Sequence, residues 1–144
     1  MKLLFDNQKM TEEFFEDSRI LGIMAPISDY HFCWQLNNLL DMELVLNNEI
    51  EIQLAKKSRN YFFGVYEYNE PTGSLSHFIY NNRFDGEYLL QEFKHLDFLW
   101  LMKGNMMDDN MLQMKIDALK SINSVQLVVE LTNEKIRNKE YMVF

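Results

Sequence analysis

The pattern of hydrophobic and polar positions predicts two helices separated by β-strands. A short apolar run, Ile20 to Met24, is ended by Pro26, and Ser28 then occupies the position of a helix N-cap. The helix that follows is expected to end near Asp41. Its buried stripe is predicted from apolar residues at helical spacing, which are Phe32, Leu36, Leu39 and Leu40.

After this helix the hydrophobic period changes to two, which is typical of half-buried strands. Residues 50–54 alternate between apolar and polar, and residues 42–46 are expected to form a shorter strand before them. Two aromatic strands, residues 61–68 and 75–81, flank a segment with the proline and glycine of a hairpin loop. We therefore expect these two strands to pair in antiparallel fashion.

The second half of the chain has the pattern of a strand, a helix and another strand. Residues 96–102 are apolar on both faces, which predicts a central strand that is covered on both sides. Asn105 is expected to cap a helix that continues to about Ile122, with an apolar stripe formed by Leu112, Ile116 and Leu119. Residues 124–131 again alternate, so this unit predicts a crossover onto the same sheet.

These elements predict one domain of the α+β class. Its sheet is expected to be largely antiparallel, with two principal helices over residues 28–41 and 105–122. Residues 1–14 are expected to form a loosely held strand or tail, and residues 15–144 the domain itself. The apolar end, residues 141–144, indicates a C-terminus docked on the body of the protein.

Composition and charge narrow the function classes. With 47% hydrophobic and 14% aromatic residues, but 5 Gly and 2 Pro, the 144-residue chain is expected to have an ordered, aromatic-rich core. A formal net charge of −8 repels phosphate backbones and anionic lipids, so we expect no nucleic-acid partner. The sequence has no apolar run of membrane-spanning length, and Asp6 comes too early for a signal peptide, which predicts a cytoplasmic protein without membrane contact.

Cysteine and histidine usage predicts neither a cofactor nor a metal. The single cysteine, Cys33, has no intramolecular disulfide partner and is expected to be a small buried hydrophobe, which is consistent with a reducing compartment. The three histidines, His31, His77 and His95, lie on separate segments without a metal-binding spacing.

Residues 90–98, Leu-Gln-Glu-Phe-Lys-His-Leu-Asp-Phe, resemble the motif that names the IPExxxVDY family of small bacterial proteins, which has no assigned activity. Glu92 and Asp97 keep the spacing of the two acidic residues of the motif. Its Ile, Pro, Val and Tyr are replaced here by Leu90, Gln91, Leu96 and Phe98. Other segments also look like landmarks of the family, namely residues 20–23, Asp29-Tyr30, residues 33–37 and Lys103-Gly104. The resemblance implies a single intracellular domain and transfers no mechanism.

Glu92 and Asp97 are the catalytic candidates, because paired carboxylates can divide acid and base roles when their surroundings separate their pKa values. Their spacing does not by itself bring them together, so a turn or ion-pair role for each is the plainer interpretation. The tyrosine of the motif is replaced by Phe98, which removes a hydroxyl that could act as a general acid.

Aromatic and methionine side chains are the candidates for a contact surface. Met106 and Met107 lie at the start of the second predicted helix, off its apolar stripe, and Tyr66 and Tyr68 lie on the first aromatic strand. The sequence contains no activated nucleophile, phosphate loop or metal cage, so we expect a non-enzymatic module that self-associates or binds another protein. The alternative is a small-molecule-binding protein or hydrolase-like enzyme that uses Glu92 and Asp97 in a pocket lined by the aromatic hairpin.

Overall fold

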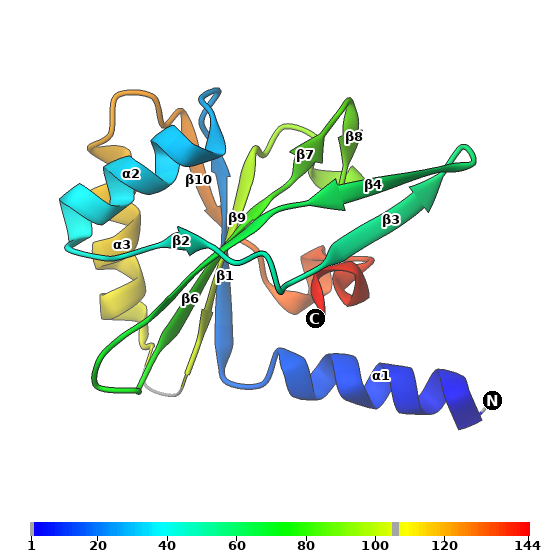
Figure 1. The fold of residues 1–144 in the computed structure, drawn as a ribbon. Helices are drawn as coiled ribbons and strands as arrows, with labels where there is room; N and C mark the ends of the chain where they lie inside the picture. The colour runs from blue at the N-terminus through cyan, green and yellow to red at the C-terminus, as the bar shows by residue number, and fades with distance from the viewer. Residues whose placement is uncertain (1, 105–106) are drawn as a thin grey trace.

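One six-stranded sheet, with strand order β10-β1-β9-β6-β5-β2, organises the computed structural model, which describes residues 2–104 and 107–144 (Figure 1). The strands are β1 (Ser18–Met24), β2 (Val45–Leu46), β5 (Val65–Asn69), β6 (Ser76–Asn81), β9 (Phe98–Lys103) and β10 (Leu127–Glu130). Every neighbouring pair is antiparallel. The predicted α+β class with a largely antiparallel sheet is therefore confirmed.

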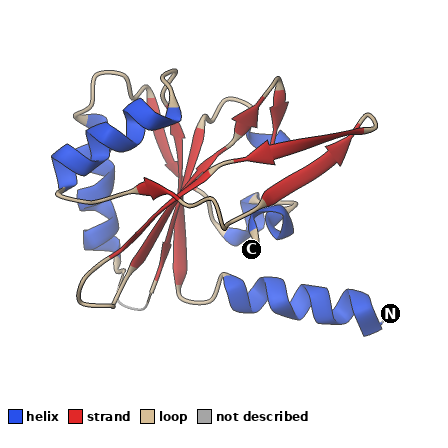
Figure 2. Ribbon diagram, viewed as in Figure 1, coloured by secondary structure: helices blue, strands red, loops and turns tan. Residues whose placement is uncertain are grey.

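Both faces of this sheet are covered (Figure 2). Helices α2 (Asp29–Leu40) and α3 (Asp109–Lys120) lie on one face. The opposite face packs against the hairpin of β3 (Ile52–Lys56) and β4 (Arg59–Phe63), and against the C-terminal segment. This segment holds two short 3-10 helices, η2 (Asn133–Lys135) and η3 (Lys139–Met142).

Strand β9 lies at the centre, between β1 and β6, as its apolar sequence predicts. Phe98, Trp100 and Met102 point into the core beneath the two helices, whereas Leu99 and Leu101 point into the core on the other face. Leu96 was expected to share a face with Phe98 and Trp100, but it precedes the strand and packs in the second core.

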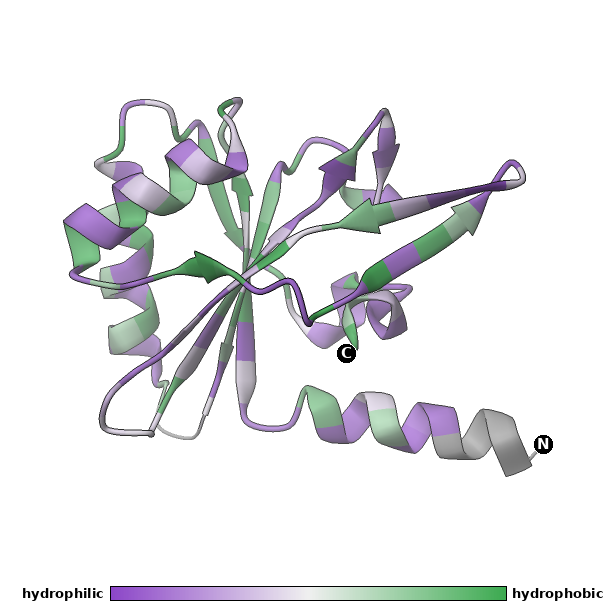
Figure 3. Cartoon of the chain, in the orientation of Figure 1, coloured by the Kyte–Doolittle hydropathy of each residue, from purple (hydrophilic) through white to green (hydrophobic). Residues whose placement is uncertain are grey.

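The expected single strand over residues 61–68 is wrong, because it breaks at Gly64 into β4 and β5. Strand β5 pairs with β6 in the main sheet, whereas β4 leaves the sheet and pairs with β3. Asn81 and Leu46 lie close to Gly64, where a Cβ atom would be 3.2 Å from Asn81 Nδ2. The tip of the β3–β4 hairpin is polar and extends away from the body (Figure 3).

The expected strand or tail at the N-terminus is also wrong, because residues Lys2–Phe14 form helix α1. The end of this helix is anchored in the body. Phe15 is buried, and the Phe14 ring lies 5.1 Å from the ring of Phe144, between centroids. The Lys103 ammonium lies 3.7 Å from the centre of the Phe14 ring. The rest of α1 extends from the body (Figure 1). Tyr80 Oη donates a hydrogen bond to the Met142 carbonyl, which confirms the docked C-terminus.

Helix α2 begins as predicted, because Ser28 Oγ accepts a hydrogen bond from His31 N. Its buried side differs from the predicted stripe. Cys33 is 2% exposed and packs with Phe32 and Leu36, whereas Leu39 is 45% exposed. The stripe is therefore displaced around the helix, and Leu39 lies near the end of α3 instead of in the core.

Helix α3 begins later than predicted. Asp108 is its N-cap and accepts a hydrogen bond from Met111 N at 2.8 Å; Asn105, the predicted cap, lies outside the described residues. Strands β9 and β10 both run antiparallel to β1, which lies between them, so they are parallel to each other. The β9–α3–β10 unit thus crosses over β1 within one sheet, and the predicted crossover is confirmed.

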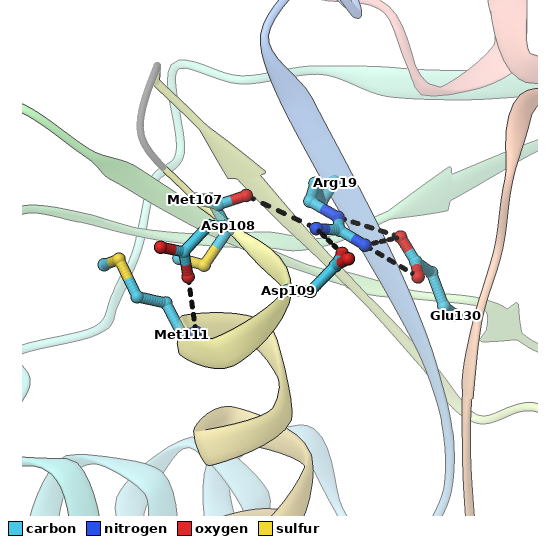
Figure 4. Close-up of polar contacts among 6 residues, drawn as sticks. All are labelled: Arg19, Met107, Asp108, Asp109, Met111 and Glu130. Carbon is cyan, nitrogen blue, oxygen red and sulfur yellow. Dashed lines mark hydrogen bonds and ion pairs between the residues drawn. The ribbon is translucent and has the colours of Figure 1, made fainter.

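Arg19 on β1 fixes the start of α3 against the sheet (Figure 4). Its Nε and Nη2 donate to the two carboxylate oxygens of Glu130 on β10, each at 2.9 Å. Its Nη1 donates to Asp109 at 2.8 Å and to the Met107 carbonyl at 3.4 Å. A guanidinium that forms a fork with one carboxylate and reaches a second holds three elements in one geometry.

Candidate functional site

The segment that carries Glu92 and Asp97 is organised by a buried asparagine, Asn82. Strands β7 (Arg83–Phe84) and β8 (Glu87–Tyr88) and the 3-10 helix η1 (Gln91–Phe93) connect β6 to β9. Asn82 is completely buried at the start of this connection. Its Oδ1 accepts from Leu90 N at 2.8 Å, and its Nδ2 donates to the carbonyls of Phe93 and Leu96, each at 2.9 Å. The sequence analysis did not identify Asn82, because only the fold shows that a side chain eight residues away caps the segment.

Glu92 has a structural position. It lies in η1, and its Oε2 accepts a hydrogen bond from Arg137 N at 2.7 Å. Its other oxygen, Oε1, is buried and has no hydrogen-bond partner among the described residues. A substrate in solvent cannot reach a buried oxygen, so this carboxylate holds the C-terminal segment in place.

Asp97 also binds a backbone amide, but at a different place. Its Oδ2 accepts from Ala25 N at 2.8 Å, at the end of β1, and its Oδ1 lies 3.6 Å from Arg83 Nη2. The two candidate carboxylates therefore bind two different segments, and they share no hydrogen bond. Asp97 alone of the two lines a cleft of about 350 Å³.

The cleft beside Asp97 has a fixed polar network at its edge. Asp29, the first residue of α2, accepts hydrogen bonds through Oδ2 from Tyr66 Oη at 3.1 Å and from Asn81 Nδ2 at 3.0 Å. Burial, and then the negative charge of Asp29, raise the pKa of the Tyr66 hydroxyl, which thus stays protonated and acts as a donor. A second hollow of about 620 Å³ shares Asp29, Asn81 and Phe84 with this cleft.

The contact residues predicted from the sequence are mostly covered. Tyr66 and Met107 are each 8% exposed and pack in the core beneath the helices, and Tyr68 is half-buried beside it. Met106 lies outside the described residues. Exposed methionine side chains instead come from the next turns of α3, where Met111 is 40% and Met114 is 70% exposed.

Tyr68 covers a buried histidine network. The His77 ring is stacked against Tyr68, with 5.9 Å between the ring centres, and its Nδ1 accepts a hydrogen bond from Trp100 Nε1 at 3.1 Å. The proton of the neutral ring therefore resides on Nε2, which donates to Glu70 Oε2 at 2.8 Å. Burial, the largest effect, lowers the pKa of His77, and the Glu70 carboxylate opposes this only in part.

We expect this network to make stability depend on pH. The unfolded chain binds a proton at His77 below about pH 6.5, whereas the folded chain resists protonation, so the free energy of unfolding decreases as the pH falls below that value. The contribution of one such group is at most about 1.4 kcal/mol per pH unit. Urea unfolding between neutral pH and about pH 5 should show a steeper decrease for the wild type than for His77→Gln. Parallel curves for the two proteins would contradict this assignment.

Large exposed side chains gather on the outer side of α2. Tyr30 is 72%, Trp34 is 55% and Leu39 is 45% exposed. Tyr30 and Trp34 are four residues apart, which places them next to each other on the helix. We call these three residues the α2 surface. The sequence analysis assigned Leu39 to the core and did not select Tyr30 or Trp34, because periodicity alone does not show which side of a helix stays uncovered.

A groove adjoins the α2 surface where α2 meets the end of α3. Its volume is about 400 Å³. The residues that line it are Trp34, Gln35, Asn38 and Leu39 from α2 and Ser121, Ile122 and Asn123 after α3. Ser124 Oγ donates to Gln35 Oε1 at 3.4 Å and joins the two sides. We call this the α2–α3 groove.

Comparisons with known proteins place no family on this site. No protein-family model matches the chain, and no curated protein matches it. The resemblance to the IPExxxVDY family thus stays a prediction. Within the described residues, no group of three or more His, Cys, Asp or Glu side chains is arranged to hold a metal ion, and no helix has the length and apolar character needed to cross a membrane.

Proposed function

We propose that this protein is a non-enzymatic interaction module that binds another protein through the α2 surface. The observation that carries the proposal is the exposure of Trp34, at 55%, between Tyr30 and the groove. Single exposed apolar residues are ordinary, but aromatic side chains grouped beside a hollow are typical of binding sites. Tryptophan and tyrosine are also the residues that most often dominate binding energy at interfaces.

A different protein is favoured over a second copy as the partner. Each copy has a net charge of −8, so two copies repel each other at long range. The α2 surface itself is aromatic and aliphatic, and it offers no opposite charge in its three residues to offset that repulsion.

Replacing Trp34 with alanine should weaken partner binding at least about 30-fold, because loss of a central aromatic contact typically costs about 2 kcal/mol or more. The fold should be preserved, with a change of less than about 0.5 kcal/mol in the free energy of unfolding, since the side chain is exposed. The experiment compares tagged wild type and Trp34→Ala in affinity capture from native lysate, with mass spectrometry. Each recovered protein is then titrated against the purified variants by calorimetry.

Phe62→Ala is the matched control, because Phe62 is 47% exposed on the β3–β4 hairpin, away from α2. The proposal requires a protein that wild type and Phe62→Ala retain and Trp34→Ala loses. Equal recovery by all three proteins would contradict it.

The second candidate function is small-molecule binding in the cleft beside Asp97. The observation in its favour is that the carboxylates of Asp29 and Asp97 and the guanidinium of Arg83 all line this cleft. Glu92 does not line it, so the hydrolase-like version would rest on Asp97 without its expected partner. Mass spectrometry of small molecules in the same affinity capture tests this candidate.

A further inference from the structure

The chemistry of the α2–α3 groove defines the kind of partner segment that it can hold, an inference that rests on the proposed function. Charged residues make up 25% of the chain, yet all seven described residues that line the groove are uncharged. A charged side chain placed there would lose hydration without gaining a counter-charge from the lining.

The lining divides into an apolar part and an amide-rich part. Trp34, Leu39 and Ile122 offer apolar surface, and Ile122 is 8% exposed at the base. Gln35, Asn38, Ser121 and Asn123 offer amide and hydroxyl groups. Amide side chains both donate and accept hydrogen bonds, so they match the N–H and C=O groups of an extended peptide.

We infer that the groove binds an uncharged, extended peptide segment of the partner, with one large apolar side chain against Trp34 and Leu39. The peptide groups on either side of that side chain pair with the amides of Gln35 and Asn123. A volume of about 400 Å³ suits one side chain with its adjoining peptide groups.

The test uses N-acetyl-leucine N-methylamide, an uncharged leucine flanked by two peptide groups, as the probe. Titration is followed by ¹H–¹⁵N correlation spectra of the full chain, which report the Trp34 indole and the Gln35 and Asn123 side-chain amides directly. We expect saturable shifts of these signals in the millimolar range, as is usual for a ligand of this size. The side-chain amide of Gln53, on the exposed side of β3, should not shift.

Gln35→Glu and Asn123→Asp introduce a charge with almost no change of shape, and each should weaken probe binding about tenfold because the apolar site is then next to a charge. Gln35→Glu keeps the oxygen that accepts from Ser124. Gln53→Glu adds the same charge elsewhere and should bind the probe like the wild type.

Equal or tighter binding of N-acetyl-lysine N-methylamide, or absence of shifts at Trp34 and the two amides, would overturn the inference. These outcomes are separate from those for the proposed function. If a partner depends on Trp34 but the leucine probe does not bind the groove, the inference falls and the proposed function stands. If the probe binds but no partner depends on Trp34, the proposed function falls, and with it the partner segment inferred here.

Discussion

Replacing Asn82 with alanine is expected to lower the free energy of unfolding by about 4 kcal/mol, because three buried backbone groups lose their hydrogen-bond partner at once. Those groups are Leu90 N and the carbonyls of Phe93 and Leu96. Asn82 is fully buried, so water does not replace the lost bonds without opening the connection between β6 and β9. Urea unfolding at constant m-value measures the loss.

The neighbouring Asn81→Ala is the matched control for this prediction. Asn81 is half-buried and its Nδ2 donates one hydrogen bond, to Asp29, so its loss should cost about 1 kcal/mol. Asn82→Asp separates hydrogen bonding from volume, since it fills the same space but turns a carboxylate oxygen toward two carbonyls. It should be at least as destabilised as Asn82→Ala. Similar losses for Asn81→Ala and Asn82→Ala would refute the role assigned to Asn82.

Asn82 also gives a physical reason for the acidic residues in the motif-like segment. Glu92 and Asp97 follow Asn82 on a connection that lacks long regular structure, and each carboxylate accepts a hydrogen bond from a distant backbone amide. Arg137 and Ala25, which supply those amides, lie on the C-terminal segment and at the end of β1. The three polar residues thus dock an irregular segment onto the body, a stabilising role that requires no catalysis.

Periodicity predicted the elements that bury one clear stripe or face. Strand β9 and the hairpin of β5 and β6 are examples, because their apolar residues leave one solution for the chain. Helix α2 was located by Ser28 and Pro26 in the same way. Its orientation was harder to predict, since Leu39 and Cys33 are both apolar and tertiary packing alone determines which one is buried.

The candidate site could be predicted far less than the fold. The cleft depends on Asp29, Asn81 and Asp97, which lie on three segments far apart in the sequence. The break at Gly64, which separates β4 from the sheet, likewise has a tertiary cause, the close approach of Asn81. Motif spacing selected Glu92 and Asp97 correctly as positions with specific bonds, but it did not indicate that the bonds are to the backbone.

The second large effect is expected at Gly104, where alanine should cost about 3 kcal/mol or more of the free energy of unfolding. The φ angle of Gly104 is +146°, a conformation that side chains with a Cβ rarely adopt. A Cβ there would also overlap the Ser74 carbonyl oxygen and lie 3.2 Å from Leu75 Cα, both backbone atoms of the β5–β6 hairpin. Gly104 N donates to the Asp17 carbonyl at 2.9 Å, so the residue cannot move away without losing the bond.

Gly73→Ala separates conformational strain from this overlap. Gly73 has a φ angle of +74° in the same hairpin, but a Cβ there would meet no atom within 4 Å. Its substitution should therefore cost only the left-handed conformation, about 1–2 kcal/mol. The excess loss in Gly104→Ala, measured by urea unfolding, is then the cost of displacing the hairpin from the end of β9. Equal losses in the two variants would mean that the backbone conformation accounts for the whole effect and that the hairpin yields freely; a larger loss at Gly104 means that Gly104 is required where the end of β9, the hairpin and the start of β1 meet.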